Sequence, residues 1–209
     1  MISTTKPHYS INPAGEKFPL PEEKDYQIEF ERLLKLTKQA HEKGQEVVVV
    51  MGAGFVGAVM AAVVAGSKDK KGKYSKFVIV CQRPSTRSYW KIPMINRGES
   101  PVKAEDPEVD TLISKCVKEE KTLVATFNSD CLSLADCVVV DVQCDFVKQD
   151  LGMMVTGEAD MAALEATIRT IGERIQPHCL TLIETTVAPG TTEFVAWPIM
   201  KKAFAARGI

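Results

Sequence analysis

The stretch from Glu46 to Gly66, EVVVVMGAGFVGAVMAAVVAG, constrains the fold of this chain more than any other. Four valines and a methionine form an unbroken apolar run, which is typical of a strand buried on both faces of a parallel sheet. This run leads directly into a glycine-rich turn at residues 52–57, and the small apolar residues at 58–65 favour a helix. Strand, glycine turn and helix in this order are the context in which a G-x-G-x-x-G pattern indicates dinucleotide binding.

Each glycine of the pattern has a physical role in holding a pyrophosphate. Gly52 permits the tight turn, Gly54 lets the backbone approach the phosphates, and Gly57 lets the helix pack closely on the strand. The helix N-terminus adds unpaired amide groups and a partial positive charge. A strand-turn-helix whose glycines serve packing alone is the plainer alternative. The residues expected to bind the cofactor here are Gly52, Ala53, Gly54, Phe55, Val56 and Gly57.

Strands and helices alternate along the rest of the chain, which predicts an α/β fold with a doubly wound parallel sheet. A loop at 83–95 is expected after the second strand, either a plain packed surface loop, which we favour, or a loop over the adenosine side of a cofactor, and a turn-rich segment follows at 96–101. The remaining strands are expected at 77–80, 123–126, 136–142 and 180–183, and the helices at 106–118, 129–135, 158–175 and from Pro189 to about 206.

The chain before this unit differs in character. Residues 1–24 are polar and contain four prolines, which predicts an irregular arm. Asp25 is the expected N-cap of an amphipathic helix that runs to about Lys43 and ends at Gly44. We expect this helix to pack against the sheet or a partner chain, and we divide the chain into an N-terminal extension (1–44) and a Rossmann-type domain (45–209).

Composition excludes several functional classes. The net charge of −1 does not favour nucleic acid or an anionic membrane surface as a partner. The sequence has neither an apolar run long enough for a membrane span nor a secretory leader, so we expect a cytoplasmic protein. The six cysteines form no C-x-x-C pair and the three histidines are scattered, so no metal site is expected.

The residue that ends the second strand bears on the choice of cofactor. An Asp or Glu there bonds the ribose hydroxyls of NAD, whereas a nearby Arg accommodates the 2′-phosphate of NADP. This chain has Cys81, Gln82 and Arg83 at that point, with Arg87 shortly after. Gln82 accepts a hydrogen bond without supplying a charge. We expect Gln82 and Arg87 to contact the cofactor, which is NAD, with NADP left open.

Several separate motifs resemble those of the UDP-glucose/GDP-mannose dehydrogenase family, the nucleotide-sugar 6-dehydrogenases. The resemblance covers roughly residues 46–209. Its most specific motif is ETTVAPGTT at 184–192, which is similar to the family's E-S-T-V-x-P-G-T-T. The other matching stretches are the glycine turn at 52–57, INRGESP at 95–101, Ala125-Thr126, and Ala135-Asp136 before a valine-rich strand.

The resemblance implies an NAD-dependent, two-step oxidation of a sugar C6 alcohol to a carboxylate, of the kind used in polysaccharide biosynthesis. UDP-glucose, GDP-mannose or a UDP-N-acetylhexosamine is the implied substrate type. Residues 142–146 map onto the segment that lines the nicotinamide side. Thr186 maps onto the threonine near the reacting carbon and is assigned a catalytic role. The cofactor contacts implied in these two segments are Val142, Gln143, Cys144, Thr185, Thr186 and Val187.

The chain also departs from the family pattern. The family's V-x-T-P reads Val142-Gln143-Cys144-Asp145 here, and the G-x-G-G-x-C nucleophile motif does not occur. The oxidation needs a thiolate to trap the aldehyde. Cys144 lies at a strand end, but the charge of Asp145 disfavours a thiolate there, so we interpret Cys144 as a lining or packed thiol.

We therefore expect the chain alone to show no turnover. The nucleotide sugar would be bound mainly by a C-terminal half that this chain lacks, and the full-length protein would be a homodimer. A non-catalytic dinucleotide-sensing or assembly module, with the first helix as its contact surface, is the alternative from another class. A β-hydroxyacid-type dehydrogenase domain is a third interpretation, against which the motif at 96–101 argues.

Overall fold

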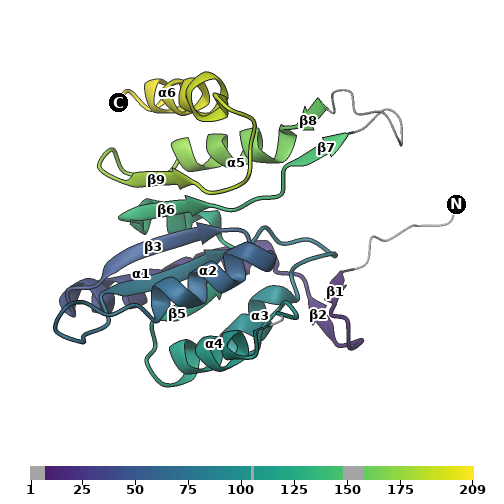
Figure 1. Ribbon diagram of the computed structural model, residues 1–209, viewed down its shortest axis with the longest axis vertical. Helices are drawn as coiled ribbons and strands as arrows, with labels where there is room; N and C mark the ends of the chain where they lie inside the picture. Colours follow the sequence, from purple (N-terminus) through teal and green to yellow (C-terminus); the bar gives the residue numbers. More distant parts are fainter. Residues whose placement is uncertain (1–7, 105, 148–157) are drawn as a thin grey trace, which may run out of the picture.

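The computed structural model describes residues 8–104, 106–147 and 158–209. Its centre is a five-stranded parallel sheet with helices on both faces (Figure 1), which confirms the predicted α/β architecture. In spatial order the strands are β5 (Leu123–Thr126), β4 (Lys76–Cys81), β3 (Glu46–Met51), β6 (Cys137–Val140) and β9 (Leu180–Ile183).

The direction in which the sheet grows reverses at β3. The chain adds β4 and β5 on one side of β3, and then β6 and β9 on the other. At the carboxyl end of β3, Met51 lies between Cys81 of β4 and Val140 of β6. In open α/β sheets, ligands bind in the crevice at this reversal, outside the carboxyl ends of the strands.

Alternate residues of β3 serve the two faces of the sheet. Val48 and Val50 pack toward one cluster of helices, and Val47 and Val49 toward the other, so the strand is apolar throughout. The first face is covered by α2 (Phe55–Ala65), α3 (Lys91–Asn96) and α4 (Glu108–Lys118). The second is covered by α1 (Glu23–Glu42), the 3₁₀ helix η1 (Ser129–Leu134), α5 (Ala162–Gly172) and α6 (Trp197–Ala206).

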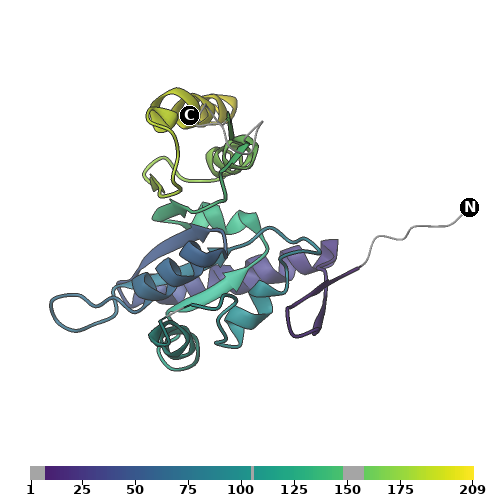
Figure 2. The same ribbon diagram turned by 45° about the vertical axis from the view of Figure 1, so that its right-hand side comes forward.

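A two-stranded hairpin replaces the irregular arm predicted at the N-terminus. Strands β1 (Tyr9–Ile11) and β2 (Lys17–Pro19) pair antiparallel beside the loop that follows β4 (Figure 2), while residues 1–7 lie outside the described chain. The connecting turn is set by Asn12, whose side-chain oxygen accepts the backbone amides of Ala14 at 3.1 Å and Glu16 at 2.8 Å. This polar turn signal is present in the sequence, but strands of three residues carry little periodicity.

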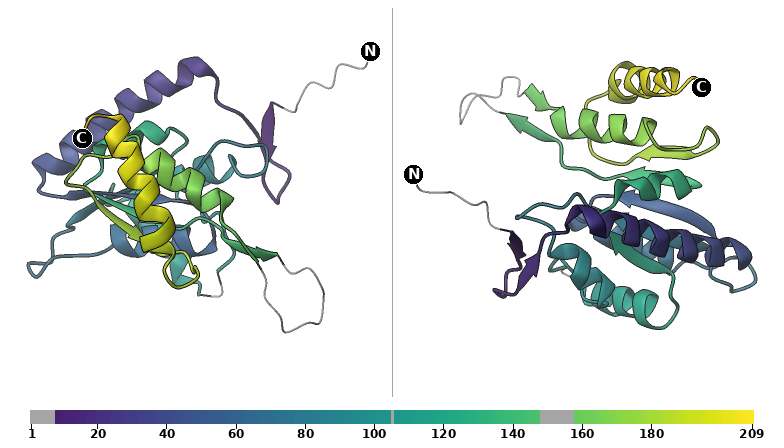
Figure 3. Two further views of the ribbon diagram at one scale, coloured as in Figure 1. Left: turned by 90° about the horizontal axis from the view of Figure 1, so that it is seen from above. Right: turned by 180° about the vertical axis from the view of Figure 1, so that it is seen from behind.

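Helix α1 begins earlier than predicted. Glu22 is its N-cap, and Asp25, expected to be the cap, instead accepts the backbone amide of Glu22 at 2.8 Å from the third helical position. This reciprocal arrangement is a capping box. Leu33 of α1 is fully buried in the core under the sheet, and Figure 3 shows the helix crossing that face. The expectation was that α1 packs against the sheet or a partner chain, and in the structure it packs against the sheet of its own chain.

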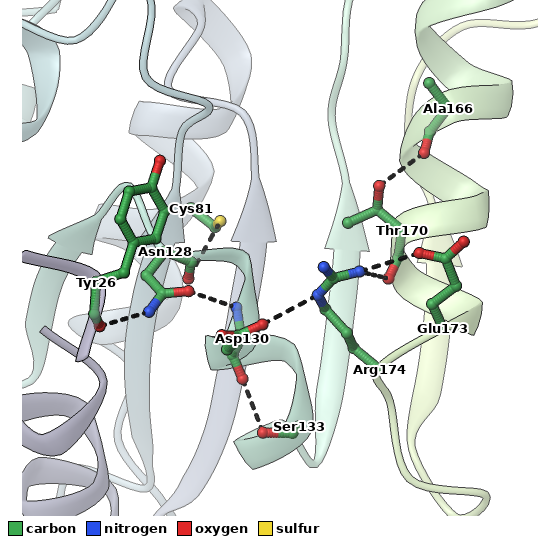
Figure 4. Close-up of polar contacts among 9 residues, drawn as sticks. All are labelled: Tyr26, Cys81, Asn128, Asp130, Ser133, Ala166, Thr170, Glu173 and Arg174. Carbon is green, nitrogen blue, oxygen red and sulfur yellow. Dashed lines mark hydrogen bonds and ion pairs between the residues drawn. The ribbon is translucent and has the colours of Figure 1, made fainter. Parts of the chain in front are cut away.

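A chain of polar contacts joins three elements on the α1 face (Figure 4). Asn128 is buried; its side chain donates to the Tyr26 carbonyl of α1 at 2.9 Å and accepts the Asp130 amide of η1 at 2.9 Å. Arg174, just after α5, in turn donates to the Asp130 carboxylate at 3.2 Å. Because Asn128 is satisfied on both sides, burying its amide stabilises the packing of α1 and η1.

Several element boundaries differ from the sequence prediction. Helix α3 lies within the expected surface loop, with Pro93 at its third position, where the missing N–H costs no helical bond. The helix predicted to begin at 158 is preceded by β8 (Glu158–Asp160), which pairs with β7 (Asp145–Val147). Helix α4 begins at Glu108 rather than at 106, with Pro107 as its N-cap. Strand β6 spans 137–140 rather than 136–142. A π-helical turn, η2 (Thr192–Ala196), precedes α6.

Candidate dinucleotide site

The glycine turn between β3 and α2 has the tight geometry that the pattern predicts. Gly52 has φ +115°, and a Cβ placed on it would lie 2.2 Å from the Asp141 carbonyl oxygen. Its amide donates to the Cys81 carbonyl at 2.9 Å, which ties the turn to the end of β4. Gly57 is equally constrained, because its Cβ would lie 2.4 Å from the Gly52 carbonyl oxygen. Internal packing therefore explains both of these glycines.

Gly54 has no such internal explanation. It is the N-cap of α2 with φ −77° and ψ −169°, a conformation open to any residue, and its Cβ would meet no atom within 4 Å. Space at this point, in front of the first amides of α2 at Phe55 and Val56, is what a pyrophosphate needs to approach the backbone. The residues present thus fit a dinucleotide, and the packing-only interpretation fails at Gly54.

Two side chains brace the turn from the β4 side. The amide of Ala53 donates to Gln82 Oε1 at 2.8 Å, and the carbonyl of Ala53 accepts from Lys91 Nζ at 2.9 Å. Gln82 Nε2 also donates to Ser88 Oγ at 3.2 Å. Gln82 therefore holds the glycine turn with the oxygen that the sequence analysis assigned to the cofactor. Sequence reasoning missed Lys91, and half-burial lowers the pKa of its ammonium group.

Asp141, which follows β6, is a second residue that sequence reasoning missed. Its carboxylate accepts the Gly57 amide in the first turn of α2, and its Oδ2 atom lies 2.7 Å from the Cβ position of Gly57. Burial raises the pKa of the carboxyl group, and the Gly57 amide partly opposes that shift. An acid ending an apolar strand was the available signal. Asp141 thus places a carboxyl group at the N-terminus of α2, the end of the helix that attracts anions.

The predicted nicotinamide-side segments meet at the ends of β6 and β9. The Thr185 hydroxyl accepts the Val142 amide at 3.1 Å and lies within donating distance of the Val142 carbonyl, at 2.9 Å, and of the Val140 carbonyl, at 3.2 Å. This side chain joins residues 142–144 to residues 185–187, as expected of two parts of one site. The side chain of Thr186 is exposed, while Val187 packs against the core.

The other predicted contacts take different environments. Phe55 and Val56 are 60% and 52% exposed, so their amides rather than their side chains face the turn. Arg87 and Gln143 are exposed, and Arg87 lies in the loop before α3. Cys144 is half-buried, with its sulfur 3.6 Å from the Asp160 carbonyl and 3.5 Å from the Met161 sulfur.

A wide cavity lies away from the glycine turn. It has a volume of about 710 Å³ and lies between β9, α5 and α6, with an apolar lining that includes Ile168, Ile183 and Phe204. We place the site at the turn because convergent backbone amides, rather than volume, bind phosphates. Over the described residues, no helix is long and apolar enough to cross a membrane, and no three His, Cys, Asp or Glu side chains group as metal ligands.

Comparison with known families now adds to this geometry. Residues 46–208 match the profile of the UDP-glucose/GDP-mannose dehydrogenase family, NAD binding domain. The chain belongs to this family. The match includes the glycine turn and both nicotinamide-side segments, so the family's NAD-binding domain is the part of its fold seen here. A comparison with curated protein sequences found no match.

Solved structures of nucleotide-sugar dehydrogenases share the fold. NDP-N-acetyl-D-galactosaminuronic acid dehydrogenase from Methanosarcina mazei is 36% identical, with a TM-score of 0.65 over 82% of this chain and 33% of its own. UDP-D-ManNAc dehydrogenase from Pyrococcus horikoshii is 25% identical, with a TM-score of 0.59 over 76% and 32%. GDP-mannose dehydrogenase from Pseudomonas aeruginosa, at 24% identity and TM-score 0.61 over 75% and 32%, supports the fold alone. The chain spans about a third of the length of these proteins.

Proposed function

We propose that this domain holds the NAD of a nucleotide-sugar 6-dehydrogenase, which oxidises a sugar C6 alcohol to a carboxylate. The observation that carries the proposal is the open backbone at Gly54, at the sheet's switch point, in a chain of this family. Bound NAD supplies a hydride acceptor. The chain's own residues supply the cradle for its pyrophosphate and the walls around its nicotinamide.

The residues divide between the two ends of that cofactor. Gly52, Gly54 and Gly57, with the amides of the first turn of α2, hold the pyrophosphate. The residues joined by Thr185 form the nicotinamide side, and Thr186 is the residue of this segment that faces the reacting carbon. The exposed side chain of Thr186 supports this role, because it is free of core packing.

The substrate proposal rests on the 36% identical relative, which is an NDP-N-acetyl-D-galactosaminuronic acid dehydrogenase. A nucleoside-diphosphate N-acetylhexosamine is therefore the first substrate to test, ahead of UDP-glucose and GDP-mannose. The relatives extend beyond the third of their length that this chain spans, and we propose that most contacts to the substrate belong to those parts. A homodimer is the assembly that we propose for a protein containing that remaining part.

Four of the six cysteines of the chain support the proposal that it is inactive alone. Burial raises the pKa of the Cys116 and Cys137 thiols, and raises that of Cys179 to about 11. The pKa of Cys131 is raised by its contact with Cys81 and by burial. Thiols held protonated in this way are poor nucleophiles, and the oxidation requires a thiolate to trap the aldehyde.

Calorimetric titration of the chain with NADH tests the cofactor role. We expect saturable binding at one site, and no binding at millimolar NADH would refute the proposal. Incubation of the same sample with NAD and UDP-N-acetylgalactosamine tests inactivity. Production of NADH by the chain alone would contradict that part while leaving the cofactor site intact.

One observation favours a second candidate, a dinucleotide-sensing module without catalysis. Gln82 stands where an acid would bond the ribose, and it braces the glycine turn instead. If the chain, by itself or within any longer protein that contains it, binds NADH but oxidises none of the three nucleotide-sugar types, this second function is the better account. The family match favours either candidate over a β-hydroxyacid dehydrogenase domain.

A further inference from the structure

The segment that follows β4 is cationic and contains no acid. From Gln82 to Gly98 the sequence has Arg83, Arg87, Lys91 and Arg97 but no Asp or Glu. Arg97 is paired with two glutamates. Within the part of the chain that the structure describes, no acid forms an ion pair with the other three cations. Arg83, Arg87 and Lys91 thus follow β4, the strand after which the ribose would lie, without an acidic ion-pair partner in the described chain.

Gln82, the polar residue that directly follows β4, forms its hydrogen bonds within the protein. Gln82 accepts the Ala53 amide at 2.8 Å and donates to Ser88 Oγ at 3.2 Å, so both ends of its amide have partners. Ser88 Oγ in turn lies 2.8 Å from Ser85 Oγ. The loop folds back on Gln82 through this pair of hydroxyls, and it presents no negative charge to whatever occupies the ribose position.

The loop that carries the cations is fixed from two sides. Ser10 of the N-terminal hairpin is buried; its hydroxyl donates to the Thr86 carbonyl at 2.9 Å and accepts the Trp90 amide at 3.2 Å. The Trp90 indole donates to the Arg87 carbonyl at 3.0 Å. Lys91 is anchored at the glycine turn through the Ala53 carbonyl. The backbone around Arg87 is therefore positioned before any ligand arrives, which lowers the entropic cost of using that guanidinium.

We propose that the ribose end of this site admits a 2′-phosphate, so that the domain binds NADPH no more weakly than NADH. The inference rests on the proposed dinucleotide site. An acid after β4 would repel a 2′-phosphate, and this chain has none. Arg83 and Arg87 supply guanidinium groups, which pair with phosphate in a bidentate geometry. The Ser85 and Ser88 hydroxyls are further donors in the same loop.

Titration of the chain with NADH and NADPH, followed by calorimetry, tests the inference. We expect a dissociation constant for NADPH equal to or below that for NADH at low salt, with the NADPH value rising more steeply as salt screens the phosphate. A dissociation constant for NADPH above that for NADH at low salt would overturn the inference and leave the proposed function standing. Absence of binding by either dinucleotide would overturn both.

Two substitutions locate the effect. Arg87→Glu, at an exposed position, should weaken NADPH binding by about tenfold or more and NADH binding by less than about threefold. Gln82→Glu keeps an oxygen to accept the Ala53 amide and places an acid after β4, so it should weaken NADPH binding relative to NADH binding. Lys38→Glu, on the exposed side of α1, is the matched control for a change in net charge. Equal losses for NADH and NADPH in Arg87→Glu would contradict the assignment.

Competition by two small ligands separates the ribose end from the rest of the cofactor. Adenosine 2′,5′-bisphosphate and 5′-AMP differ only in the 2′-phosphate. We expect the 2′,5′-bisphosphate to displace NADPH at a lower concentration than 5′-AMP does, and Arg87→Glu to remove that difference. Displacement by 5′-AMP at an equal or lower concentration in the unsubstituted chain would overturn the inference.

Discussion

Alanine at the three glycines of the turn should separate folding from cofactor binding. At Gly52 an added Cβ meets the Asp141 carbonyl oxygen at 2.2 Å, and at Gly57 it meets the Gly52 carbonyl oxygen at 2.4 Å. Backbone atoms cannot move aside as a flexible side chain can. At Gly54 the same methyl group meets nothing within 4 Å. The three substitutions are chemically identical, so their different outcomes report only the surroundings.

The magnitudes follow from these contacts. Overpacking against backbone at Gly57 should lower the free energy of unfolding by about 3 kcal/mol or more. For a domain of this size that is a fall of roughly 6–12 °C in melting temperature. At Gly54, the loss of a favourable N-cap residue lowers stability, and the smaller conformational freedom of alanine in the unfolded chain raises it. The two effects nearly cancel, which leaves a change in the free energy of unfolding within about 1 kcal/mol. The methyl group would nevertheless stand where the pyrophosphate approaches, and we expect binding to weaken by at least about tenfold.

Thermal unfolding and NADH titration on the same samples give the assay. Gly54→Ala should melt within about 4 °C of the unsubstituted chain and bind NADH poorly, whereas Gly57→Ala should melt early. Gly54→Ala that binds NADH with unchanged affinity would refute the placement of the pyrophosphate. Gly57→Ala with unchanged stability would show that the close approach of α2 to β3 is not as tight as the geometry requires.

Three further predictions concern residues around the site and the core. Asp141→Asn should tighten NADH binding at pH 7, about threefold or more, because it removes a charge beside the pyrophosphate. Burial raises the pKa of the Asp141 carboxyl above its ordinary value of 3.8. The free energy of unfolding therefore falls as the pH rises from 3.8 through the raised pKa, and urea titrations at several pH values should show that Asp141→Asn lacks this fall. Ser10→Ala leaves the amide of buried Trp90 without its acceptor and should cost about 1–3 kcal/mol in urea unfolding. Leu33→Ala should cost about 2–5 kcal/mol, against less than about 0.5 for the partly exposed Leu34→Ala; equal costs would contradict the packing of α1.

The parts of the fold that the sequence predicted well are those with strong local patterns. The strands at 123–126 and 180–183 have the predicted boundaries, because each is a short, mainly apolar run of the kind that a buried strand uses. The glycine turn was readable because its glycines stand at fixed spacing between an apolar strand and an apolar helix. Gly52 also has a local reason to be glycine, since its φ of +115° suits no other residue well.

The missed features depend on contacts between distant residues. Nothing near Lys91 in the sequence shows that its ammonium reaches the Ala53 carbonyl, and nothing near Gln82 shows that its oxygen turns toward the same residue. The hairpin strand at Tyr9–Ile11 is three residues long and is fixed by Ser10 contacts to a loop 76 positions away. Helix α3 was hidden by Pro93, which usually argues against a helix but is tolerated in a first turn.

The capping and burial of α1 have a practical consequence for work on this domain. The family match starts at residue 46, which invites expression of the chain from that point. Such a truncation would strip Leu33 and Ala40 from the underside of the sheet and expose Phe77 and Ile79 to water. It would also remove the hairpin that clamps the loop after β4. Expression from residue 46 would therefore yield a domain with exposed apolar surface and a loop after β4 that lacks its contacts to the hairpin. Weak cofactor binding by such a domain would say little about the intact chain.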